Sequence, residues 1–171
     1  MKSLTKIFFV PVLLLFAGCS GSVKIPAVTG FDAERYMGTW YEVARLPNRF
    51  EKGMTGVSAV YSLRPDGRVD VVNSGVKNGV KKSVTGVAYL AGKPGEGLLK
   101  VSFFRPFYGP YRIIKLSPDY RYSVVTGADP SYLWILARER ELSERDLDEI
   151  LTFLRARGFA VEKLVWPWRP A

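Results

Sequence analysis

Short apolar and β-branched stretches alternate with turn-forming residues along the middle of the chain, and this pattern predicts β-strands. Gly, Asn and Pro, which supply the backbone angles of tight turns, gather at 64–67, 78–79, 93–95, 108–110, 117–119 and 128–130. Strands are predicted at 39–46, 54–63, 68–76, 81–91, 98–105, 111–117, 121–127 and 132–139. Because most connections are short, we expect an all-β, eight-stranded antiparallel up-and-down barrel without free edge strands.

One helix is predicted after the last strand. Ser143 is a suitable N-cap, Asp146 lies three residues later, and Gly158 is a suitable C-terminal stop. The apolar positions between them form a single stripe of Leu147, Ile150, Leu151 and Leu154. We expect this stripe to pack on the outside of the barrel; the alternative is a helix that lies on a membrane. A further short strand is expected at 161–166.

The N-terminus has the pattern of a bacterial export signal. Two lysines precede an apolar stretch, Ile7–Ala17, that is too short to cross a bilayer as a helix. The stretch ends in Leu15-Phe16-Ala17-Gly18-Cys19, which resembles the lipobox of bacterial lipoproteins. This resemblance implies lipidation of Cys19 and, because Ser20 follows it, sorting to the outer membrane, with the protein on the periplasmic side. The alternative is an ordinary secretion signal followed by a free cysteine.

Composition narrows the possible chemistry. The chain has no histidine and one cysteine, which excludes Ser-His-Asp and Cys-His catalysis, His-ligated zinc or haem, and an intrachain disulfide. We expect no metal, no cofactor and no catalytic residue. The formal net charge of +9 would suit nucleic acid or an anionic membrane surface. Export to the cell envelope favours the membrane, and no nucleic-acid partner is expected.

Three segments together resemble the conserved motifs of the lipocalins. The first is 31–42, with Gly38-Thr39-Trp40, and its continuation through 43–51 resembles bacterial lipocalins and apolipoprotein D-like proteins. The second is 118–122, where Pro118 replaces the usual Thr, and the third is 133–138, which ends in Arg138. The segment 101–109 is similar to the bacterial outer-membrane lipoprotein group. The resemblance implies a signal peptide at 1–18, a lipidated tether at 19–30 and a lipocalin domain at 31–171.

Gly38, Trp40 and Arg138 are expected to be structural. By the resemblance, Trp40 fills the closed end of the barrel, and Arg138 stacks on its ring in a cation–π contact. Because Gly38 has no side chain, the backbone at this position can come close to neighbouring groups.

Alternation along a strand suggests which other side chains face the interior. If Trp40 points inward, so do Glu42 and Ala44. In the third motif, alternation from Arg138 likewise directs Trp134 into the interior of the barrel. The full set of candidate ligand-binding residues is Glu42, Ala44, Tyr61, Phe104, Tyr108, Tyr111 and Trp134. The alternative for Trp134 is that it is an ordinary aromatic residue of the core and does not line a cavity. For Glu42 we favour a structural pair with an Arg or Tyr over contact with a ligand head group.

The segment 105–111 is expected to form an aromatic loop at the open end of the barrel. There Phe107 and Tyr108 either gate a ligand or cap the rim. Arg45, Arg49 and Lys52 flank the first loop at the same end and could meet a carboxylate or phosphate. For these three we favour an ordinary solvated surface.

Three functions are compatible with this sequence. The first is a non-enzymatic lipid-binding protein that holds or transports a fatty acid, lysophospholipid or similar ligand, in membrane maintenance. The second is a lipocalin-fold enzyme, for example one that uses Glu42 as an acid or base. The third is a protein-interaction scaffold of the cell envelope, which a barrel filled by side chains would favour. The first accounts for the export signal, the barrel and the apolar interior together; the oligomeric state stays open.

Overall fold

The predicted barrel is present. The computed structural model describes residues 25–168, so Cys19 and the expected signal peptide lie outside the described part. Eight antiparallel strands form a closed barrel in sequence order, with β1 also paired to β8. The strands are β1 (Gly38–Arg45), β2 (Met54–Leu63), β3 (Val69–Lys77), β4 (Val80–Leu90), β5 (Leu98–Phe104), β6 (Phe107–Leu116), β7 (Tyr122–Thr126) and β8 (Leu133–Ala137).

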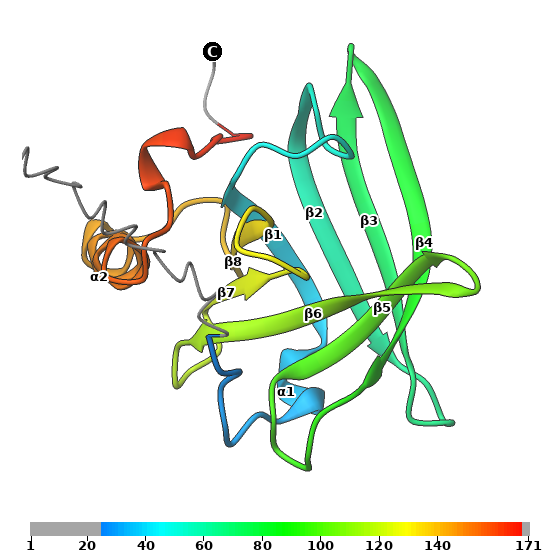
Figure 1. Ribbon diagram of the computed structural model, residues 1–171. Coiled ribbons are helices and arrows are strands. Elements are labelled where there is room, and N and C mark those ends of the chain that lie inside the picture. The colour runs from blue at the N-terminus through cyan, green and yellow to red at the C-terminus, as the bar shows by residue number, and fades with distance from the viewer. Residues whose placement is uncertain (1–24, 169–171) are drawn as a thin grey trace, which may run out of the picture.

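A short helix, α1 (Ala33–Tyr36), lies across one end of the barrel (Figure 1). Asp32 caps it by accepting hydrogen bonds from the backbone N–H groups of Glu34 and Arg35. Because β1 starts at this closed end, the β1–β2, β3–β4, β5–β6 and β7–β8 connections lie at the opposite, open end.

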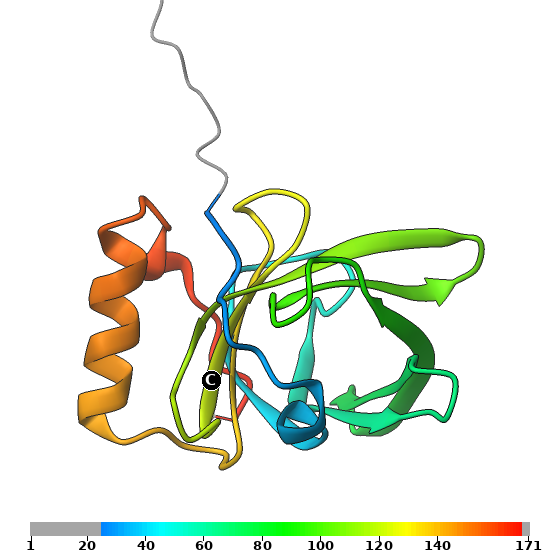
Figure 2. The same ribbon diagram turned by 90° about the horizontal axis from the view of Figure 1, so that it is seen from below.

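The second helix, α2 (Glu144–Arg155), lies outside the barrel (Figure 2). Ser143 caps it as predicted, accepting from the Asp146 N–H at 3.1 Å. At its C-terminus Gly158 has φ +77°, and the Phe159 N–H donates to the Leu154 carbonyl. Ile150 and Leu154 pack in a cluster with outward-facing residues of β1, β6, β7 and β8, which confirms the packing role of the stripe. No helix among residues 25–168 is long and apolar enough to cross a membrane.

Two segments differ from expectation. Instead of a strand at 161–166 there is a 3-10 helix, η1 (Val161–Lys163), followed by an isolated bridge between Val165 and Arg45. In the region expected to be a tether, Val28 already exchanges backbone hydrogen bonds with Ile113 and Gly97, and its side chain packs on the barrel core. The residues just before the first motif therefore form part of the folded body.

Candidate functional site

The interior of the barrel contains a cavity. The centres of water molecules could occupy about 120 Å³ of it, roughly ten times the space that one water needs. Most of the wall is apolar, and its aliphatic side chains come from six of the eight strands. The lining residues are Glu42, Glu51, Val57, Ser58, Ala59, Tyr61, Val71, Asn73, Ala88, Leu99, Val101, Phe103, Pro110, Tyr111, Trp134 and Leu136.

Four of the predicted ligand-binding residues line this cavity: Glu42, Tyr61, Tyr111 and Trp134. Trp134 stands near the open end, and its Nε1 donates to Glu51 Oε2 at 2.8 Å. This hydrogen bond fixes one edge of the indole, while the ring forms part of the cavity wall. A ligand in the cavity would therefore contact Trp134.

Three tyrosines form a hydrogen-bonded group deeper in the barrel. The Tyr111 hydroxyl is 2.8 Å from that of Tyr36 and 3.0 Å from that of Tyr61, and Tyr36 also donates to Ser123. Burial raises the pKa of Tyr36 to about 12, and it also raises the pKa values of Tyr61 and Tyr111 well above their usual range. All three hydroxyls are therefore neutral at physiological pH and bonded mainly to one another.

The charged part of the wall consists of Glu42 and Glu51, and Arg45, which does not line the cavity itself, contacts both. Its guanidinium pairs with Glu42 through Nη1 and lies 4.0 Å from Glu51 through Nε. Its Nη2 donates to the carbonyls of Glu51 and Met54 at 2.8 and 3.0 Å. Arg45 therefore ties the segment between β1 and β2 to the barrel. Glu42 has the structural Arg partner that the sequence analysis favoured.

Burial and the neighbouring Glu51 carboxylate outweigh Arg45 and raise the pKa of Glu42 to about 8. In the unfolded chain this carboxyl returns to about 4.5. Between these two values the folded protein holds a proton that the unfolded chain releases. Binding of this proton stabilises the folded state relative to the unfolded chain. This contribution to the free energy of unfolding is fully present below pH 4.5 and is lost as pH rises through about 8.

We expect the free energy of unfolding to fall between pH 5 and pH 8.5, and the Glu42→Gln variant to fall less. Urea denaturation of both proteins across this range measures the difference. Equal slopes for the two proteins would show that Glu42 does not carry the extra proton.

Ala44 does not line the cavity, and the prediction for it is wrong. A β-bulge interrupts the pairing of β1 with β8 between Glu42 and Ala44. Beyond it, Ala44 pairs with outward-facing Ile135 and packs in the cluster that also contains Ile150 of α2. Arg45 takes the inward position opposite Trp134 and is only 3% exposed, so the expected solvated surface at Arg45 is also wrong.

Phe104 and Tyr108 also lie outside the cavity. Leu99, Val101 and Phe103 share the inward face of β5, so Phe104 points out and is 79% exposed. The expected loop at 105–111 is instead a tight hairpin, because β5 ends at Phe104 and β6 begins at Phe107. Tyr108 stands on β6 with its ring centroid 5.3 Å from that of Tyr89, so it contacts a neighbouring ring rather than the cavity.

The three motif residues meet at the closed end. The Arg138 guanidinium carbon lies 3.9 Å from the centre of the Trp40 ring, which is fully buried. Arg138 also donates to the backbone carbonyls of Thr39, Arg35 and Tyr120. A Cβ on Gly38 would lie 3.4 Å from Arg138 Nη1, and its φ is +93°.

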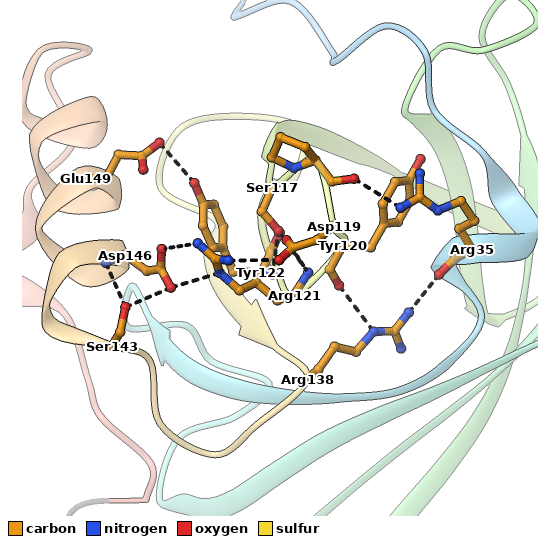
Figure 3. Close-up of polar contacts among 11 residues, drawn as sticks. Arg35, Ser117, Asp119, Tyr120, Arg121, Tyr122, Arg138, Ser143, Asp146 and Glu149 are labelled. Carbon is orange, nitrogen blue, oxygen red and sulfur yellow. Dashed lines mark hydrogen bonds and ion pairs between the residues drawn. The ribbon is translucent and has the colours of Figure 1, made fainter.

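A polar network extends from Arg138 to α2 (Figure 3). Arg35 reaches the carbonyl of Pro118, and Arg121 forms a double contact with Asp146 at 2.9 and 2.7 Å. Tyr122 donates to Glu149 of the same helix. The second motif thus connects the closed end of the barrel to the outer helix.

Most of the other lining residues were not predicted from the sequence, among them the polar Glu51 and Asn73 and the aromatic Phe103. Asn73 shares an alternating face with Val71, so a usable signal existed for it. Glu51 belongs to a segment without regular periodicity, so no pattern placed it. Within residues 25–168, no group of three Asp, Glu, His or Cys side chains could hold a metal ion.

Comparison with known proteins assigns the family. A model described as a lipocalin-like domain matches residues 31–169. Outer membrane lipoprotein Blc of Escherichia coli K12 is 41% identical over 99% of both chains. Apolipoprotein D of Macaca fascicularis is 31% identical over 81% of this chain and 77% of its own. The solved structure of insecticyanin from Manduca sexta superposes with a TM-score of 0.69 at 21% identity, covering 85% of each chain.

The full-length match to outer membrane lipoproteins supports the lipid-anchored, outer-membrane location expected from the sequence. The chain belongs to the lipocalin family, within its bacterial outer membrane lipoprotein group.

Proposed function

We propose that this lipocalin holds one fatty acid, lysophospholipid or similar single-chain amphiphile in its barrel and serves in maintenance of the outer membrane. The observation that carries the proposal is the cavity of about 120 Å³, with its predominantly apolar wall. Such a wall favours a hydrocarbon chain, since burial of each methylene contributes ~0.8 kcal/mol. The cavity argues against the scaffold hypothesis, and membership in the lipocalin family supports a binding protein rather than an enzyme.

A fluorescence titration tests this proposal. Protein carrying Cys19→Ala, with its fold checked by near-UV circular dichroism, is titrated with lauric acid and with a lysophospholipid. We expect tryptophan emission to change and to saturate at one ligand per chain, because Trp134 lines the cavity.

Trp134→Phe is the control, since Trp40, Trp166 and Trp168 also emit. It should retain binding in a calorimetric titration but lose most of the optical change. Ala59→Leu, which fills the cavity from β2, should weaken binding. Absence of binding by every chain length to the folded protein would refute the proposal.

We further propose that residues 1–18 are removed and that Cys19 carries the lipid anchor. The proposal rests on the lipobox-like sequence and on the lone cysteine at its end. Intact-mass analysis of protein from the membrane fraction should show the loss of 1–18 and the addition of acyl groups. Cys19→Ala should move the protein to the soluble fraction. Membrane-bound protein with an unmodified Cys19 would contradict the anchor.

A further inference from the structure

The charged groups that line the cavity are all of one sign. Glu42 of β1 and Glu51 of the β1–β2 connection contribute carboxyl groups, and no Lys or Arg is among the lining residues. Glu51 keeps 16% of its side chain exposed and Glu42 only 3%, so the pair extends from near the open end into the interior.

Arg45, which lies behind these carboxyls, is not available to a ligand. Its Nη1 contacts Glu42 Oε1, and its Nη2 donates to two backbone carbonyls. The remaining Nε faces Glu51. A carboxylate or phosphate entering the cavity would therefore meet acidic oxygens without a free guanidinium to bind.

A further polar atom of the wall has no partner. Asn73 Oδ1 on β3 is buried and has no hydrogen bond in the described structure. An unpaired buried acceptor costs about 1–3 kcal/mol. Because Asn73 lines the same cavity as the two glutamates, a ligand group that donates hydrogen bonds would remove this cost.

We propose that Glu42 and Glu51, together with Asn73 in the lining of the same cavity, select a single-chain amphiphile with a cationic, ammonium-type head group over one with an anionic head. The inference rests on the proposed lipid-binding function and names its ligand class. A fatty acid would have to keep its carboxylate outside the cavity or bind it in protonated form.

Binding of a cation to this site should be linked to release of a proton. The titratable and charged groups that face Glu42 are Arg45 of the same strand, Glu51 and, from β2, Tyr61. Two carboxyls and one guanidinium carry a net charge of −1 when both carboxyls are ionised, and one bound proton neutralises it. A cation at this site competes with that proton, so its affinity should increase as pH rises.

Ligands with the same chain, whose charges do not change between pH 6.5 and 8.5, test the proposal. Dodecylammonium, which is also able to donate hydrogen bonds to Asn73, dodecyl sulfate and dodecanol are titrated calorimetrically, below their micelle-forming concentrations, into the folded Cys19→Ala protein at pH 6.5 and 8.5. At pH 8.5 we expect the cation to bind about tenfold or more tightly than the anion, as expected for charges a few ångströms apart in a partly buried site. The cation should lose affinity at pH 6.5, and dodecanol should vary little.

Variants that remove one charge each show which carboxyl groups cause the preference for the cation. Glu51→Gln and Glu42→Gln should each reduce the preference for the cation, and Glu42→Gln should also remove most of its pH dependence. Glu34→Gln is the matched control, because it removes the same charge from the exposed surface of α1 at the closed end. It should leave the preference unchanged.

The outcomes separate this inference from the proposed function. Binding of all three ligands with equal affinity, or tighter binding of the anion, would overturn the head-group selection while leaving chain binding intact. If none of the three ligands binds, dodecanol included, both the head-group selection and the proposed lipid-binding function would be overturned. A cation preference that persists in both glutamine variants would also refute the assigned site.

Discussion

Replacing Trp40 with alanine should lower the free energy of unfolding by about 3–5 kcal/mol, the usual loss for a large buried aromatic side chain. Its ring is fully buried at the closed end, with the Tyr36 ring centroid 4.7 Å away and Arg138 across its face. Its Nε1 also donates to the Tyr36 carbonyl at 2.8 Å, so the substitution removes a hydrogen bond that holds α1 against the barrel. Urea denaturation at pH 7 measures the loss.

A double-mutant cycle with Arg138 tests the contact itself. Arg138→Ala should cost less than Trp40→Ala, because much of the guanidinium is bonded to backbone carbonyls at the surface. In the Trp40→Ala background its cost should shrink by about 0.5–2 kcal/mol, the range of a cation–π contact. Strictly additive losses would show that the ring and the guanidinium do not stabilise one another.

The second large effect should come from Arg45→Met, which keeps similar volume but removes the charge. Breaking a buried ion pair by removing one partner costs about 3–5 kcal/mol. Here it also removes the two hydrogen bonds from the guanidinium to the carbonyls of Glu51 and Met54, which hold the β1–β2 connection against the barrel. We expect a loss of this size at pH 8.5, measured by urea denaturation.

The loss should be smaller at pH 6. Without Arg45, the pKa of Glu42 rises beyond about 8, and the carboxyl can stay protonated in the folded state as pH falls. Arg64→Met is the control, because Arg64 pairs with Asp66 and Asp70 at 3.3 and 3.4 Å on the surface. Such exposed pairs contribute about 0–1 kcal/mol. If Arg45→Met were no more damaging than Arg64→Met, the buried cluster would not hold the connection.

The order and number of the strands could be predicted because turn residues and strand-like runs alternate regularly. Both boundaries of β2 agree with the prediction, and most others differ by one or two residues. The largest difference is at β6, which starts at Phe107 because the aromatic residues after Pro106 continue the sheet. The helix cap at Ser143 was predictable because capping depends on local sequence.

Side-chain orientation near the site was less predictable, because a single bulge reverses it. Strict alternation from Trp40 places Ala44 inside, but the bulge after Glu42 turns Ala44 outward and Arg45 inward. Glu51 could not be placed from sequence patterns either, since its position in the wall depends on a tertiary contact with Trp134. The apolar wall in outline and the inward position of Glu42 were thus predictable, whereas the position of Glu51 was not.

Native mass spectrometry of the protein extracted from its own outer membrane shows whether the barrel carries a lipid in its natural setting. We expect a barrel with acylated Cys19 and one additional non-covalent mass, which collisional activation releases as a single-chain lipid. An acylated protein that repeatedly carries no lipid, and that binds none when lipid is added, would contradict the proposed lipid-binding function.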